Sequence, residues 1–166
     1  MVTVRHFFIT ALVAAAGIIV FFWFFTGDEA KIKKQFKNLA ELVSKDSDEH
    51  QLMAAASAKK IGDMFTESCR IEIASHSISR TYKRENIPAH VIAARSQYST
   101  ILLKFHDIQV SFPEVGIARV LFTAYIEAVT LPGEQIREVH EFVCRMEKLE
   151  KHWFFNQIEA VSVLER

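Results

Sequence analysis

The residue of this sequence best suited to chemistry is His140, which falls on the apolar side of a predicted strand. A histidine titrates near neutral pH, so it can act as a general base or as a donor to a ligand. The alternative is a structural histidine that is only hydrogen-bonded at the end of a core. His90 and His106 are not at a metal-ligand spacing from it, and no second histidine follows to make an H-E-x-x-H motif. We therefore expect no metal and no cofactor.

Nucleophile and phosphate motifs are missing from the sequence. The five glycines are scattered rather than gathered in a phosphate-binding loop, and there is no G-x-S-x-G turn. Cys69 and Cys144 are not in a C-x-x-C or other metal-ligand spacing. They can form a disulfide in an oxidising compartment, but we favour buried free thiols, because Cys144 lies on an apolar strand face.

Two long predicted strands, residues 117–130 and 135–148, position His140 and Cys144. Alternate residues on one side are small or apolar, which is typical of strands with one buried face. In the first strand these are Ala118, Val120, Phe122, Ala124, Ile126 and Ala128, and in the second Ile136, His140, Phe142, Cys144 and Met146. The pattern predicts an antiparallel hairpin, with a bulge somewhere in strands of this length.

The loop length sets the register of this hairpin. A two-residue loop would place Phe122 opposite Val143, on the other face, whereas an odd loop places Phe122 opposite Cys144. Pro-Gly favours a type II turn, which is not a favoured two-residue hairpin turn, so we predict the odd loop. The further pairs predicted are Val120–Met146, Ala124–Phe142 and the oppositely charged Arg119–Glu147.

Helices and shorter strands precede and follow the hairpin. We predict helices at residues 28–45, 49–68 and 85–98, and strands at 70–75, 78–83, 100–112 and 153–164. The first helix has apolar residues at helical spacing, Ile32, Phe36, Leu39 and Val43, and its lysines either face solvent or contact anionic lipid. The second has Leu52, Ala55, Ala58, Ile61 and Phe65 as its predicted buried stripe.

Residues 7–25 form an uncharged apolar run long enough to cross a bilayer core. A cleaved signal peptide is the alternative, but no small-x-small cleavage site precedes Asp28. We predict a retained anchor in residues 1–27 and one domain in residues 28–166. The lysines after the run favour a cytoplasmic domain, whereas a short basic amino terminus before an uncleaved apolar segment is the signal-anchor layout. We expect the exported, periplasmic side.

The charge balance argues against one class of partner. The chain has 20 Lys and Arg residues and 20 Asp and Glu residues, a formal net charge of zero. Nucleic-acid binding needs a basic face, so we expect no nucleic-acid partner.

The predicted element order is helix, helix, short strand pair, helix, and then longer antiparallel strands. With the terminal segment Lys151-His152-Trp153-Phe154-Phe155, this order resembles the nuclear-transport-factor-two-like superfamily, a cystatin-like cone that includes ketosteroid isomerase and the SnoaL-like proteins. The resemblance implies an α+β fold in which three helices cover one face of a curved antiparallel sheet. Because this superfamily contains enzymes, ligand binders and scaffolds, the resemblance does not by itself imply an activity.

The resemblance implies a pocket between the sheet and the helices. His140, Tyr98, Phe122 and Phe142 are its candidate lining residues, and Tyr98 would reach it from the third helix or simply pack there. The isomerases of the group use an Asp base with Tyr and a protonated Asp. Asp107 and Tyr125 have suitable side chains but match no family motif, and Tyr125 falls on the mixed face.

Two functions from different classes follow. The first is a membrane-tethered, non-catalytic module that binds a small apolar ligand or a second copy of the chain. Its interface candidates, Leu121, Tyr125, Val139 and Val143, lie on the mixed face of the hairpin. The second is a small isomerase or hydrolase with its site in the cone. A closed, water-accessible cavity that contains His140 and a carboxylate would favour it, and a cone filled by Phe122, Phe142 and Met146 would falsify it.

Overall fold

The computed structural model of the chain describes residues 27–73 and 78–161. Its helical segments are the first helix (residues 27–43), α2 (Gln51–Gly62), the short 3-10 helix η2 (Arg84–Asn86) and α3 (Ile87–Arg95). Its strands are β1 (Phe65–Ile73), β2 (Ile78–Lys83), β3 (Tyr98–Glu114), β4 (Ile117–Thr130), β5 (Gln135–Leu149) and β6 (His152–Ala160). The described residues therefore form an α+β fold.

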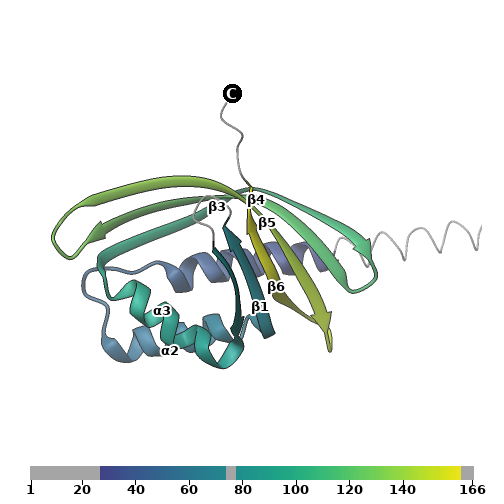
Figure 1. Cartoon of the computed structure of the whole chain (residues 1–166), viewed down its shortest axis with the longest axis horizontal. Helices are drawn as coiled ribbons and strands as arrows, with labels where there is room; N and C mark the ends of the chain where they lie inside the picture. The colour runs from purple at the N-terminus through teal and green to yellow at the C-terminus, as the bar shows by residue number, and fades with distance from the viewer. Residues whose placement is uncertain (1–26, 74–77, 162–166) are drawn as a thin grey trace, which may run out of the picture.

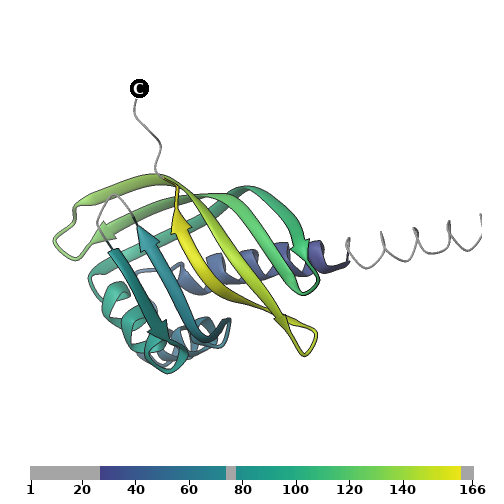
Figure 2. The same cartoon turned by 45° about the vertical axis from the view of Figure 1, so that its right-hand side comes forward.

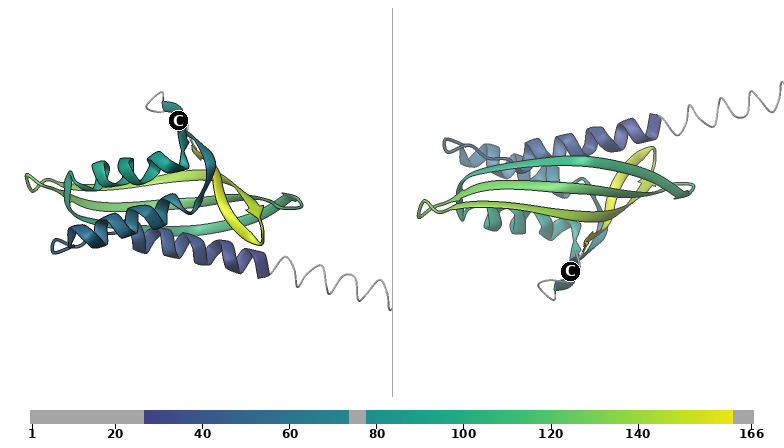
Figure 3. Two further views of the ribbon diagram at one scale, coloured as in Figure 1. Left: turned by 90° about the horizontal axis from the view of Figure 1, so that it is seen from below. Right: turned by 90° about the horizontal axis from the view of Figure 1, so that it is seen from above.

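One curved sheet contains all of these strands, in the order β2-β1-β6-β5-β4-β3. The long strands β3, β4 and β5 arch over the helices (Figure 1), and β6, β1 and β2 continue the sheet at one end (Figure 2). Seen from below and from above, the helices lie on a single face of the sheet (Figure 3). β1 and β6 pair in parallel, whereas the sheet was expected to be wholly antiparallel.

The β4–β5 hairpin has the predicted buried face but a different register. Phe122 pairs with Phe142 rather than with Cys144, so each predicted partner is wrong by two residues. The loop is odd, as predicted, but it has three residues: Thr130 N donates to Glu134 O at 2.9 Å, and Gly133 closes the turn at φ +97°. A shift of two residues keeps every side chain on its face, which is why the buried face was predicted correctly.

The remaining predicted pairs are wrong by the same step. The observed pairs are Val120–Cys144, Ala118–Met146, Ala124–His140 and Arg119–Arg145. The last places two like charges opposite each other in place of the predicted Arg119–Glu147 pair. The bulges expected in the long strands occur where β4 pairs with β3 and where β5 pairs with β6, and not between β4 and β5.

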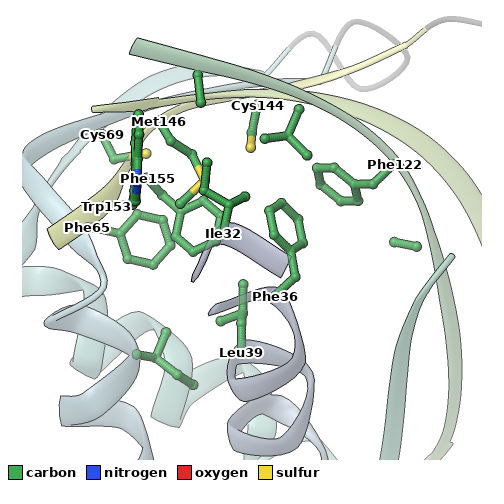
Figure 4. Packing of buried hydrophobic residues seen from close by; sticks show 14 of the residues in the cluster. Ile32, Phe36, Leu39, Phe65, Cys69, Phe122, Cys144, Met146, Trp153 and Phe155 are labelled. Carbon is green, nitrogen blue, oxygen red and sulfur yellow. The ribbon is translucent and has the colours of Figure 1, made fainter. Parts of the chain in front are cut away.

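The first helix presents its predicted stripe to the concave face of the sheet. Phe36 is fully buried, and its ring lies 4.8 Å from that of Phe122, 5.2 Å from that of Phe105 and 5.3 Å from that of Phe155. Figure 4 shows this side chain pointing from the helix between the sheet residues. Burial of so much aromatic surface is the main source of stability for this layer.

α2 is shorter than predicted and its buried face is narrower. It ends at Gly62, and Phe65 belongs to β1 rather than to a helix. Leu52 is 76% exposed, and Ala55 is also exposed, although both were expected in the buried stripe. The buried residues of α2 are Ala58, Ile61 and Gly62, all in the second half of the helix.

α3 also ends earlier than predicted. Pro88 lies in its first turn, as expected, but the helix stops at Arg95 and Tyr98 begins β3. The prediction that Tyr98 reaches the cone from a helix is therefore wrong.

Among residues 27–73 and 78–161, no helix is both long and apolar enough to cross a membrane. The span predicted over residues 7–25 lies outside the described residues, so it stays a prediction.

Candidate ligand groove

The β4–β5 hairpin arches over α3 at one end of the sheet (Figure 1). The side chains at this end enclose a groove on the concave face of the sheet. Its volume is about 330 Å³. The first helix, α3 and the three long strands all contribute lining residues, which are Val43, Val91, Ala94, Arg95, Tyr98, Ile101, Leu103, Ile126, Ala128, Ile136 and Glu138.

Strand alternation places the apolar wall of this groove. Ile126 and Ala128 on β4 and Ile136 on β5 point to the same face as the buried core, and Ala128 pairs directly with Ile136. Ala94 and Ala128 are small, so space stays open at this end of the cone. In the middle of the cone, by contrast, aromatic side chains fill the space. The arrangement suits a ligand with a mainly apolar body.

Arg95 is the charged residue that this groove buries. It is only 5% exposed, although it is at the end of α3. Its Nη2 donates to Glu49 Oε1 at 2.7 Å and to Ser44 O at 3.0 Å. Its Nε and Nη1 are also buried, and neither has a hydrogen-bond partner within the described part of the chain. The burial of Arg95 was not predicted from the sequence, because a lone arginine at a helix end carries no signal of burial.

Tyr98 does line this groove, but from the start of β3. The side chain of Lys45 holds the segment between α3 and β3: its Nζ donates to Tyr98 O at 2.6 Å and to Arg95 O at 3.3 Å. Cations are favoured at the carboxyl end of a helix, which is the place that Lys45 takes here.

His140 lies next to the groove rather than in its wall. Its side chain is 50% exposed, and its Nε2 lies 3.1 Å from Oε2 of Glu138, which does line the groove. β6 pairs with β5 only from Phe142 to Leu149, so His140 is on a stretch of β5 that β6 leaves uncovered. A histidine beside a carboxylate is a possible proton acceptor, but this one is solvated.

Phe122 and Phe142 belong to the packed middle of the cone. Phe122 is 5% exposed, and its ring stacks on that of Phe142 at 5.6 Å. Neither residue lines the groove. The aromatic side chains that were predicted to surround a ligand thus fill the space themselves.

The four interface candidates lie together on the convex face. Leu121 pairs with Val143 and Tyr125 pairs with Val139 across the hairpin. Val139 is 59% exposed and the other three are partly exposed. The structure therefore brings these residues into one surface, opposite the helices.

A small polar cluster lies at the edge of this surface. Tyr125 Oη donates to Glu127 at 2.9 Å, and Arg137 donates to the same carboxylate at 3.0 Å. The hydrogen bond from Arg137 lowers the pKa of Glu127, and the hydrogen bond to Glu127 raises the pKa of Tyr125. Both changes favour the arrangement of a neutral phenol beside a charged carboxylate.

The isomerase constellation is not assembled. Asp107 is exposed at a bulge of β3, with φ +52°, and Tyr125 is on the convex face. Neither lines the groove. Within residues 27–73 and 78–161, no three His, Cys, Asp or Glu side chains lie together in a way that could hold a metal ion.

Cys69 and Cys144 are both buried in the core with free thiols (Figure 4). Burial raises the pKa of Cys69 to about 12 and also raises the pKa of Cys144. Their thiols stay protonated at neutral pH, so they behave as small apolar side chains rather than as nucleophiles.

A larger hollow of about 530 Å³ lies between the first helix, α2 and the β5–β6 turn. Its rim carries the lysines Lys31, Lys34, Lys60 and Lys151. All four are exposed, which is typical of a solvated surface. We prefer the groove beside α3 because it lies on the concave face of the sheet and buries a charged group.

Comparisons with known proteins find matches to the fold of this chain but not to its sequence. No protein-family model matches the chain, and no curated protein matches its sequence. Solved structures do match, at low identity. A candidate scytalone dehydratase from Novosphingobium aromaticivorans has a TM-score of 0.66 at 11% identity, over 84% of this chain and 86% of that one.

Two further matches are named for different roles, one for an enzyme activity and one for association. The hexachlorocyclohexane dehydrochlorinase LinA-type3 from Novosphingobium barchaimii has a TM-score of 0.64 at 9% identity, over 82% of this chain and 86% of that one. A candidate calcium/calmodulin-dependent protein kinase II association domain from Xanthomonas campestris has a TM-score of 0.58 at 11% identity, over 84% and 88% of the two chains. The described part of this chain thus shares its cone-shaped α+β fold with these solved structures. Because identities this low show the fold alone, the function is argued from the groove.

Proposed function

We propose that this protein is a non-catalytic binding module, held at a membrane by residues 7–25, that takes a small, mainly apolar ligand into the groove beside α3. The observation that carries the proposal is the apolar wall of Ile126, Ala128 and Ile136, which stays open while the rest of the cone is filled. A wall of this kind holds a ligand by excluding water from its apolar surface.

The test uses the full chain in lipid nanodiscs and the neutral probe 2-naphthylmethanol, with empty nanodiscs as the blank. Ile136→Trp places a large side chain in the groove, and we expect it to weaken binding about tenfold or more, since it removes most of the buried contact. Gln135→Trp is the matched control, because Gln135 is the neighbouring exposed residue on the other face of β5. Equal binding by both variants, or no binding by the wild type, would refute the proposal.

The tether rests on the apolar run alone. Its uninterrupted length supports a span, and the signal-anchor layout supports a domain on the exported, periplasmic side. Release of the full chain from membranes by alkaline carbonate, without detergent, would contradict the tether.

We also infer that the convex face forms a homodimer. Two cross-strand pairs, Leu121–Val143 and Tyr125–Val139, give this face an apolar centre between charged residues. A structure of the same fold is named as an association domain, which supports assembly as a role for this fold.

A small isomerase or hydrolase is the second candidate. It is favoured by the His140–Glu138 pair at the edge of the groove and by two enzymes among the similar structures. The packing of Phe122, Phe142 and Met146 in the middle of the cone counts against it. The solvated position of His140 also counts against it, because a general base acts best in a water-excluded site. If the protein converts a bound compound and His140→Gln abolishes this turnover, the enzyme would replace the binding module as the favoured function.

A further inference from the structure

The guanidinium of Arg95 is buried but incompletely partnered. A guanidinium has five N–H donors, and Nε and Nη1 carry three of them. In this protein those two nitrogens are shielded from solvent and have no acceptor among the described residues, whereas Nη2 is fully used by Glu49 and Ser44. Buried donors normally have partners, so the free donors of Arg95 indicate a missing acceptor.

The charges around Arg95 favour a negatively charged acceptor. Glu49 balances one cation, while the ammonium of Lys45, which is bonded to the backbone at the end of α3, adds a second. Glu138, on β5, is the carboxylate that lines the groove, but it is 55% exposed and pairs with His140. Lys45 and Glu49 lie behind Arg95 rather than in the lining of the groove, so the buried charged group of the lining is the guanidinium of Arg95.

We propose that the ligand of this groove is an apolar carboxylic acid, whose carboxylate accepts hydrogen bonds from Nε or Nη1 of Arg95. Its apolar body lies against the wall formed by Ile126, Ala128 and Ile136. This inference rests on the proposed function of the groove, and it adds the chemical class of the ligand. Charge-assisted hydrogen bonds are the strongest kind available to a buried guanidinium, so the acid is selected over a neutral molecule of the same shape.

The experiment compares 2-naphthoate with 2-naphthylmethanol on the full chain in nanodiscs. We expect the wild type to bind the acid about tenfold or more tightly than the alcohol, which corresponds to one hydrogen bond to a charged group. Arg95→Gln should reduce the ratio of the two affinities to about twofold or less, because only the acid uses the guanidinium while both probes contact the same apolar wall.

Glu49→Gln separates ligand binding from a structural role of the ion pair. It breaks the same pair but keeps the donors of Arg95, so the preference for the acid should stay or rise. If Arg95→Gln does not fold, Glu49→Gln still tests the inference. Loss of the preference for the acid in Glu49→Gln would mean that Arg95 acts only on structure, through the ion pair, and would overturn the inference. Equal affinities in the wild type would overturn the carboxylate inference and leave the groove proposal intact. Failure of both probes to bind would overturn the groove proposal, and with it this inference.

Discussion

Single aromatic residues decide how much of the cone is open. Phe36 reaches from the first helix to rings on β3, β4 and β6, and these contacts fill the space between helix and sheet. The groove begins where the side chains become small, at Ala94 and Ala128. The division between core and groove is thus set by side-chain size along one continuous face.

We expect Phe36→Ala to lower the free energy of unfolding by about 3–5 kcal/mol, because it leaves a cavity among rings that cannot close fully. Leu52→Ala is the control, since Leu52 is 76% exposed, and it should change the free energy by about 0.5 kcal/mol or less. Denaturant unfolding of the full chain measures both. A loss for Leu52→Ala as large as that for Phe36→Ala would mean that α2 packs differently.

At the level of residues, spacing predicted the core of the first helix but not the groove. Ile32, Phe36 and Leu39 lie on one face of a helix whatever it packs against, so their burial could be read from the sequence. Leu52 has the same kind of spacing and is exposed, because burial also depends on a neighbour that α2 lacks at that end. The burial of Arg95 depends on Glu49 and Ser44, which are distant in the sequence, and no local pattern encodes it.

At the level of elements, alternation predicted the faces of the hairpin, and the turn decided its register. The left-handed glycine at position 133 allows a loop of only three residues, whereas the predicted pairs required a longer one. The β1–β6 pairing joins segments far apart in the chain, so its parallel direction could not be read from local patterns. The predicted strand faces nevertheless put the four interface candidates on one surface, although the predicted register was wrong.

The homodimer is tested on that surface. Val139→Glu puts a charge at the centre of the convex face, and we expect it to weaken dimerisation about tenfold or more, as loss of a central contact does. Val115→Glu is the matched control, because Val115 is 99% exposed in the β3–β4 turn. Sedimentation equilibrium of the full chain in detergent measures both variants. A wild type that is monomeric at every concentration would contradict the dimer.

At the level of the whole molecule, the cone fold leaves one end of its concave face open. β5 runs on past the end of β6 toward the hairpin tip, and α3 covers that extension only in part (Figure 1). The resemblance in element order predicted this fold and a space between sheet and helices. It could not predict that Phe122 and Phe142 fill the middle of that space, because the filling depends on contacts from the first helix.

The central claim is that a small apolar ligand binds at this open end. Intermolecular nuclear Overhauser effects between bound 2-naphthylmethanol and methyl-labelled protein test it most directly. The account predicts contacts to the methyl groups of Ile101, Ile126 and Ile136, which line the groove. Contacts instead to Leu42 and Met64, which line the lysine-rimmed hollow on the other side of the first helix, would contradict it.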